Sequence, residues 1–164
     1  MGGCPPGPAQ EELMLETGSR LFDFSLENQY GELFETDQLN TGRALIVFYP
    51  WAFSRVCGSE LEALQENADF FTEHHVRIIA ISVDHKFTLR NYAHSLGLQF
   101  DLLADFWPHG QIASLADAFD ESRGVALRKS FYVVDGVIRH IFVSAMTSAR
   151  DMETYKKVIS ETID

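Results

Sequence analysis

The sequence predicts an α/β fold in which helices flank a mixed central sheet. Two nearly continuous apolar runs, "RALIVFY" at 43–49 and "VRIIAISV" at 76–83, favour strands that are covered on both faces. After the first run, apolar residues recur at spacings of three and four, as in a helix, and the second run is followed by a stretch that ends at a typical helix-terminating glycine. Near the end, apolar stretches on both sides of Asp135-Gly136 indicate a hairpin, which adds antiparallel strands to the sheet.

The first half of the chain predicts a hairpin, a buried strand and a helix. "RLFDFSL" alternates from Leu21 onward, and "GELFET" follows it after a short turn, so we expect an N-terminal β-hairpin. The strand at 43–49 ends at Pro50, because proline has no N–H to donate to a neighbouring strand. From Ser54 the apolar spacing becomes that of a helix. Its apolar stripe consists of Leu61, Leu64, Ala68 and Phe71.

The second half predicts further alternation of strands and helices. After the strand at 76–83, a helix over 86–97 ends at Gly97, because glycine accepts the positive φ common at that position. "FDLLAD" predicts a short strand and "GQIASLADAF" a short helix, and after the Asp135-Gly136 hairpin a C-terminal helix covers 149–163. Its apolar side consists of Met152, Tyr155, Val158 and Ile159. This order of elements is that of the thioredoxin-like fold with an N-terminal extension.

Length and composition fit one folded domain. We expect a flexible N-terminal tail over 1–18, where "MGGCPPGPAQEE" is rich in Gly and Pro, and a single domain over 19–164. The formal net charge of −11 repels polyanions, so neither nucleic acid nor membrane is an expected partner. No apolar run approaches the ~18 residues of a membrane helix. Two cysteines make no disulfide framework, which indicates a reducing, cytoplasmic location.

Cys57 is predicted in the first turn of the helix that follows the strand at 43–49. Unpaired backbone N–H groups and the helix dipole at that end favour a thiolate, and such positions lower a cysteine pKa from ~8.5 towards ~3.5–7.5. The alternative is a buried structural cysteine, which packs as a small apolar residue. Ser54 stands three residues earlier and shares a helix face with Cys57. Its hydroxyl can donate to the thiolate, and it can also serve as an N-cap.

The residues before Cys57 form a motif. Pro50 closes one side of the expected pocket without offering a donor, while Trp51 and Phe53 add apolar shielding or simply pack. Proline, then serine four residues on, then cysteine three further, as in "PWAFSRVC", matches the peroxiredoxin signature. "FYPWAFSRVCGSEL" and "LLADFWPHG" resemble in particular the AhpE-type one-cysteine peroxiredoxins. The resemblance covers nearly the whole chain apart from the tail.

The resemblance implies a role for each residue of the motif. Cys57 would attack the terminal oxygen of a peroxide, Ser54 would orient that peroxide, and Pro50 would shield the thiolate. Ser54 replaces the commoner threonine, which leaves the hydrogen bond intact but removes one methyl group.

Two further residues are carried over from the family. Arg128, in "GVALRKSFYVVDGVIR", is the implied arginine whose guanidinium stabilises the thiolate and the developing charge. By itself an arginine before a strand is an ordinary surface residue. Glu60 is implied to orient an arginine, either Arg128 or Arg55, and by itself is a solvated helix residue.

The implied activity is that of a thiol-dependent peroxidase. It would reduce hydrogen peroxide, organic hydroperoxides or peroxynitrite through a cysteine sulfenic acid, and an external low-molecular-weight thiol or small redoxin would recycle it. The subgroup also implies a homodimer, which exposed aromatic residues at 51–53 and 106–107 would permit. We expect no cofactor, and no metal either, because His85 and His109 lack the spacing of metal ligands.

The positions of the cysteines predict a one-cysteine cycle. Glu60 occupies the second position of a C-x-x-C pair, and Glu62 occupies a position from which some peroxiredoxins resolve the oxidised cysteine. Cys4, in the tail, is the other thiol of the chain. Two alternatives remain open. One is a peroxide-sensing or redox-relay module with negligible turnover, and the other is an inert scaffold with a buried Cys57, against which Ser54 and Arg128 argue.

Overall fold

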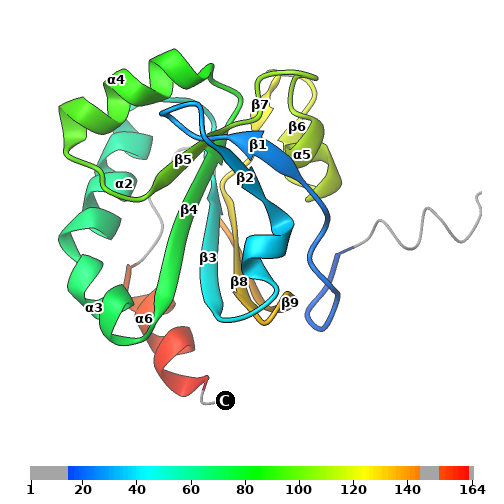
Figure 1. Cartoon of the computed structure of the whole chain (residues 1–164), viewed down its shortest axis with the longest axis vertical. Helices are drawn as coiled ribbons and strands as arrows, with labels where there is room; N and C mark the ends of the chain where they lie inside the picture. Colours follow the sequence, from blue (N-terminus) through cyan, green and yellow to red (C-terminus); the bar gives the residue numbers. More distant parts are fainter. Residues whose placement is uncertain (1–14, 145–151, 163–164) are drawn as a thin grey trace, which may run out of the picture.

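A computed structural model describes residues 15–144 and 152–162, without the side chains of 55–57. Five strands form a central sheet in the order β5-β4-β3-β8-β9 (Figure 1). They are β3 (Arg43–Phe48), β4 (Val76–Ser82), β5 (Asp101–Ala104), β8 (Lys129–Val134) and β9 (Val137–Val143). The strands β3, β4 and β5 are parallel, whereas β8 and β9 are antiparallel to their neighbours. The predicted mixed sheet is therefore confirmed.

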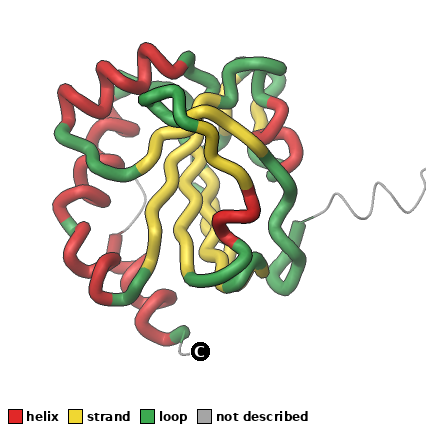
Figure 2. The backbone as a smooth tube through the Cα atoms, viewed as in Figure 1, coloured by secondary structure: helices red, strands yellow, loops and turns green. Residues whose placement is uncertain are grey.

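The sheet is covered on both faces (Figures 1 and 2). One face carries α2 (Arg55–Glu66), α3 (Ala68–Glu73), α4 (Lys86–Leu96) and α6 (Met152–Glu161). The other carries β1 (Ser25–Glu27), β2 (Leu33–Glu35), the 3₁₀ helix η1 (Thr36–Leu39), α5 (Gln111–Leu115), β6 (Phe119–Asp120) and β7 (Val125–Ala126). Side chains alternate along β3, so that Leu45 and Val47 join the first core while Ala44 and Ile46 join the second. This double cover explains the unbroken apolar run.

The helix predicted from Ser54 is interrupted at Asn67. The side chain of Asn67 donates to the carbonyl of Ala63 at 2.7 Å, and its backbone leaves helical geometry at φ −101° and ψ 19°. Asparagine competes for backbone partners in this way, which explains the division into α2 and α3. The predicted stripe still faces the core, with Leu61, Leu64 and Phe71 buried.

The N-terminal hairpin is confirmed but shorter than its alternating stretch. The strands β1 and β2 pair antiparallel, with Leu26 opposite Phe34, as a separate two-stranded sheet. Before them, Arg20 forms a β-bridge with Val137, so the chain enters along β9. The two-residue strands β6 and β7 were not predicted, because two residues carry no periodic signal.

The remaining boundaries follow local chemistry. Gly97 ends α4 at φ 68°, as predicted. The helix predicted within 110–119 stops at Leu115, since the chain turns at Asp117 with φ 54°. Most of the predicted tail, including Cys4, and the ends of the predicted C-terminal helix lie outside the described residues. No helix in the described part of the chain is both long and apolar enough to cross a bilayer.

Candidate active site

The loop between β3 and α2 carries Pro50 and Ser54. Pro50 is buried where the strand ends. The side chains of Trp51 and Phe53 are 41% and 55% exposed, more than full shielding of a pocket would require. Phe53 nevertheless packs on Tyr92 of α4, with their ring centroids 4.8 Å apart.

Ser54 occupies the N-cap position of α2. Its carbonyl accepts the N–H of Gly58 at 2.9 Å, which is the first intrahelical bond. Residue 57 is the third residue of α2 and lies in the first turn, as predicted, where backbone N–H groups lack intrahelical partners. The predictions for the side chains of Cys57 and Arg55 fall outside the described residues.

A buried ion pair lies one turn further along α2. The guanidinium Nη1 of Arg128 donates to Oε1 of Glu60, and the two side chains are 1% and 4% exposed. Of the two arginines considered for Glu60, Arg128 is therefore a partner in the structure. Arg128 directly precedes Lys129, which pairs with Phe48 at the end of β3. Arg128 is thus a buried residue beside the point where β3 leaves the sheet.

The ion pair links Arg128 to the helix face of position 57. Cys57 and Glu60 are three residues apart, and residues at this spacing share a face with Cβ atoms ~5–6 Å apart. Glu60, which binds the guanidinium of Arg128, therefore stands one turn after position 57 on the same helix face. Because both groups are buried, the charge is weakly screened and its position is fixed by its partner. A fixed positive charge beside a helix N-terminus favours a thiolate there.

A second buried carboxylate, Asp105, lies at the end of β5. It accepts the N–H groups of Ile112 at 3.0 Å and Ala113 at 2.8 Å, at the start of α5. Burial raises the pKa of Asp105 to about 6, although these hydrogen bonds and the charge of His109 act in the opposite direction. Asp105 therefore acts as a cap for α5, a role that its sequence context did not reveal.

The opposite end of α5 is held by Lys129, whose burial was not predicted from the sequence either. Its Nζ donates to the carbonyls of Ala116 at 3.2 Å and Asp117 at 3.1 Å, just beyond the helix. Burial lowers the pKa of Lys129, while the nearby Asp117 charge raises it. A lysine at the start of an apolar strand gives no signal of burial, because its partners come from a different element.

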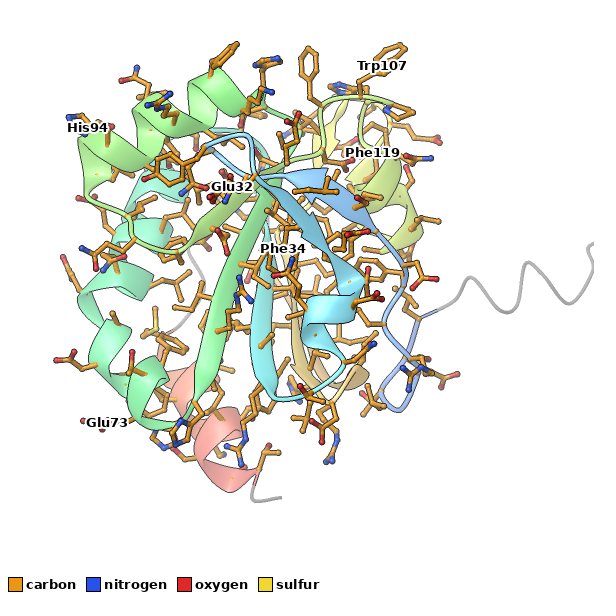
Figure 3. All side chains as sticks on the ribbon, viewed as in Figure 1. Glu32, Phe34, Glu73, His94, Trp107 and Phe119 are labelled. Carbon is orange, nitrogen blue, oxygen red and sulfur yellow. The ribbon has the colours of Figure 1, made fainter. Side chains whose placement is uncertain are left out.

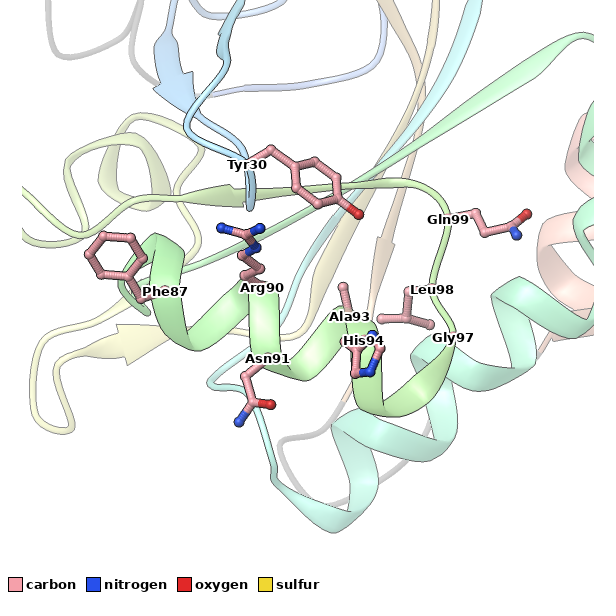
Figure 4. A pocket seen from close by; sticks show the side chains of 9 residues that line it. All are labelled: Tyr30, Phe87, Arg90, Asn91, Ala93, His94, Gly97, Leu98 and Gln99. Atoms are coloured by element: carbon pink, nitrogen blue, oxygen red, sulfur yellow. The ribbon is translucent and has the colours of Figure 1, made fainter.

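One surface groove is lined by residues other than those predicted for the site. Among the described residues, no group of three or more His, Cys, Asp or Glu side chains is arranged to hold a metal. A groove of about 620 Å³ runs along α4 (Figure 4), with Arg90 and Tyr30 on its two sides. It is lined by Tyr30, Phe87, Arg90, Asn91, Ala93, His94, Gly97, Leu98 and Gln99. None of the predicted site residues lines it.

The chain is similar in sequence and in fold to known proteins. The family model described as "AhpC/TSA family" matches residues 17–141. Alkyl hydroperoxide reductase E of Mycobacterium tuberculosis is 33% identical over 150 residues, which cover 90% of this chain and 97% of that protein. The crystal structure of Enterococcus faecalis AhpC aligns with a TM-score of 0.82 and 26% identity, covering 90% of this chain and 92% of that one. Peroxidoxin BcpB from Mycobacterium tuberculosis, with a TM-score of 0.81, 20% identity and coverage of 92% and 100%, shows the shared fold alone.

Proposed function

This chain belongs to the AhpC/TSA family of peroxiredoxins, which are thiol-dependent peroxidases, and we propose that Cys57 is its nucleophile. The observation that carries this proposal is the buried Glu60–Arg128 pair, because Glu60 stands one helical turn after position 57 and binds the Arg128 guanidinium. A cysteine that serves packing alone gains nothing from a desolvated cation beside it. A thiolate that must be kept ionised and then react gains both stability and a partner for the developing charge.

The proposed reaction is a nucleophilic displacement at oxygen. The Cys57 thiolate attacks the terminal oxygen of a hydroperoxide, so that an S–O bond forms as the O–O bond breaks. The leaving alkoxide or hydroxide takes up a proton and departs as an alcohol or water, and with peroxynitrite the leaving group is nitrite. Sulfur is oxidised to the sulfenic acid, and the peroxide is reduced by the same two electrons.

The neighbouring groups divide the work. Ser54 stands at the N-cap, three residues before Cys57, where its hydroxyl can orient the peroxide oxygens. Arg128 offers several donors in a planar fork and keeps its charge, which suits both the thiolate and the charge that develops during displacement. Pro50 is buried at the strand end and offers no N–H to compete for the thiolate.

Recycling is proposed to need an external thiol. A low-molecular-weight thiol or small redoxin condenses with the sulfenic acid, releasing water and leaving a mixed disulfide. A second thiol then releases the Cys57 thiolate and forms the disulfide of the reductant. Each turnover thus converts one peroxide and two thiols into an alcohol or water, one disulfide and one further water. We further propose a reducing, cytoplasmic location, because these thiols are held reduced there.

The substrates are proposed to be hydrogen peroxide, organic hydroperoxides and peroxynitrite. Support comes from the 33% identical relative, whose name, alkyl hydroperoxide reductase, specifies an organic hydroperoxide. A net charge of −11 would slow the approach of strongly anionic peroxides, so neutral hydroperoxides are the better substrates at low salt.

We also propose a homodimer formed through exposed aromatic residues. Trp51 and Phe53 lie beside the site, and Phe106 and Trp107 are 45% and 80% exposed on another loop (Figure 3 shows Trp107). Aromatic side chains are enriched in the centres of interfaces. Sedimentation should give twice the chain mass, and Trp107→Ser should shift it towards the monomer. A wild-type monomer at tens of micromolar would refute the dimer.

The site assignment is tested by mass spectrometry with dimedone trapping. After one equivalent of peroxide, wild-type protein should carry the dimedone adduct on Cys57. Cys57→Ser should lose peroxide reduction entirely, whereas Cys4→Ser should keep the first oxidation. Equal losses in both variants would refute the assignment, and a dominant Cys4–Cys57 disulfide would refute the one-cysteine cycle. Multiple-turnover peroxide consumption with a supplied thiol separates a peroxidase from a sensor of the same fold.

A further inference from the structure

One carboxylate that has no part in the proposed reaction binds the loop that carries Pro50 and Ser54. Oδ2 of Asp84, just beyond β4, accepts the backbone N–H of Ala52 at 2.7 Å. The same oxygen accepts the hydroxyl of Ser82 at 2.7 Å. Ser82 is fully buried at the end of β4, and its Oγ in turn accepts the N–H of Asp84 at 3.3 Å. The Asp84 carboxylate is therefore held in place by Ser82 of the sheet, and it binds the loop from this fixed position.

The attachment point lies at the middle of the loop. Ala52 is buried and stands two residues after Pro50 and two residues before Ser54. At one end the loop is held by the sheet, where the N–H of Tyr49 donates to Ile81 at 3.1 Å. At the other end it is held by α2, through the carbonyl of Ser54. The hydrogen bond to Asp84 is a third attachment of the loop, between the attachments at its two ends.

The backbone of this loop adopts a conformation that requires a stabilising contact. Phe53, next to Ala52, has a φ of 65°, in the left-handed region where a side chain collides with its own backbone. Residues persist there when surrounding contacts over-determine the backbone. A hydrogen bond from a backbone N–H to a carboxylate is shorter and stronger than one between neutral groups, so it can supply this constraint.

We propose that Asp84 is a positioning residue for the peroxide reaction. By binding the Ala52 amide it sets the path of the loop between Pro50 and Ser54, and hence where the Ser54 hydroxyl meets a peroxide bound at position 57. This inference rests on the proposed function, because it assigns Asp84 no contact with substrate. A displacement of the reacting groups by about 1 Å can lower a rate by about 10²-fold.

The test compares Asp84→Ala with Asp84→Asn. Stopped-flow measurement of the reaction between reduced protein and hydrogen peroxide should give a second-order rate constant lowered about 10- to 100-fold in Asp84→Ala. Asp84→Asn should recover most of that loss, because its amide oxygen still accepts the Ala52 N–H. The pKa of Cys57, from the pH dependence of alkylation, should stay at the wild-type value in both variants, since the Glu60–Arg128 pair is untouched.

Asp120→Ala is the matched control. Its carboxylate also accepts a serine hydroxyl at 2.7 Å and a backbone N–H at 3.0 Å, both from Ser122, but in the turn between β6 and β7. The rate constant of this variant should equal that of the wild type. Ser82→Ala, which removes one of the two bonds to Oδ2 of Asp84, should lower the rate by a few-fold and serves if Asp84→Ala does not fold.

The outcomes are distinct. If the wild type reacts and folded Asp84→Ala, or Ser82→Ala in its place, reacts equally fast, the positioning role is overturned while the proposed function stands. A fall in rate accompanied by an equal fall in Asp120→Ala, or by a raised Cys57 pKa, also overturns it. If wild-type protein does not consume peroxide at all, the proposed function fails, and the role of Asp84 in it fails as well.

Discussion

Two strand-to-helix connections of this fold, the crossover from β3 to α2 and the crossover from β5 to α5, have similar sequences. They differ in which groups bind a buried carboxylate. Each runs from a parallel strand through a loop with a tryptophan and a proline into a helix, as "FYPWAFS" into α2 and "ADFWPHG" into α5. Glu60 of the first is bound by the Arg128 guanidinium, whereas Asp105 of the second accepts two backbone N–H groups. A guanidinium partner supplies a full positive charge, while amide partners leave burial to raise the pKa of Asp105 to about 6.

The difference shows that a buried acid is not by itself a sign of chemistry. The guanidinium held by Glu60 lies at the first turns of a twelve-residue helix, where a reactive group can use it. Asp105 and Lys129 instead close the two ends of a five-residue helix that is too short to be stable by itself. The first crossover is therefore the candidate for catalysis and the second for structure.

The largest effect is expected from Arg128→Gln. Removing the guanidinium should slow the peroxide reaction by roughly 10²-fold or more and raise the pKa of Cys57. It should also lower the free energy of unfolding by about 3–5 kcal/mol, because Glu60 is left as an uncompensated buried charge. Stopped-flow kinetics, the pH dependence of alkylation and urea unfolding measure the three quantities.

A double variant separates these effects. Arg128→Gln with Glu60→Gln removes both charges and should recover much of the lost stability without recovering the rate. Arg77→Gln, at an exposed arginine paired with Asp101 at 3.0 Å, is the control and should change neither. An unchanged Cys57 pKa together with a near-normal rate in Arg128→Gln would remove Arg128 from the site.

Changes at Asp105 of the second crossover should alter the free energy of unfolding and leave the rate of the peroxide reaction unchanged. Between pH 3.8 and about 6 the folded state binds more protons at Asp105 than the unfolded state does. The contribution of Asp105 to the free energy of unfolding therefore falls as pH rises through this window, by about 3 kcal/mol, and is level above it. Asp105→Asn has no such titration. The stability of the wild type relative to Asp105→Asn, from urea unfolding, should fall by about 2 kcal/mol between pH 4 and pH 7.

Asp120 serves as a control, because its pKa is shifted in the opposite direction to that of Asp105. Hydrogen bonds from Ser122 lower the pKa of Asp120, so its contribution is present above pH 3.8 and is lost as pH falls. The same comparison with Asp120→Asn should show no decrease between pH 4 and pH 7. A loss of peroxide reactivity in folded Asp105→Asn would contradict the structural role assigned to the second crossover.

The smallest expected effect is optical. Each of the two loops carries one of the chain's two tryptophans, Trp51 in the first and Trp107 in the second. Fluorescence can therefore report on the two crossovers separately. Oxidation of Cys57 should change the emission of wild-type protein and of Trp107→Phe, because Trp51 lies beside the site. Trp51→Phe should lose the change. A signal that survives in Trp51→Phe and disappears in Trp107→Phe would place the sensitive environment at the second loop.

Features with a local cause were predictable from residue order. The strands at 43–49 and 76–83, the end of α4 at Gly97 and the place of Cys57 in a first helical turn all follow from apolar spacing, glycine and proline. The family signature added Ser54 and Arg128 as candidates. The break at Asn67 was missed, since the apolar stripe continues through it and a single side-chain hydrogen bond decides the matter.

Features with partners distant in sequence emerged from packing. Glu60 had two candidate arginines, and its pairing with Arg128, 68 positions away, required β8 to lie beside β3. The hold of Asp84 on Ala52, and the burial of Asp105 and Lys129 at the ends of α5, likewise depend on strand order. Local spacing reports which face of an element is apolar, but the groups that meet across two elements are set by how those faces pack. The proposed reactive residue could therefore be chosen from the sequence, whereas the buried contacts near it could be identified from the folded arrangement alone.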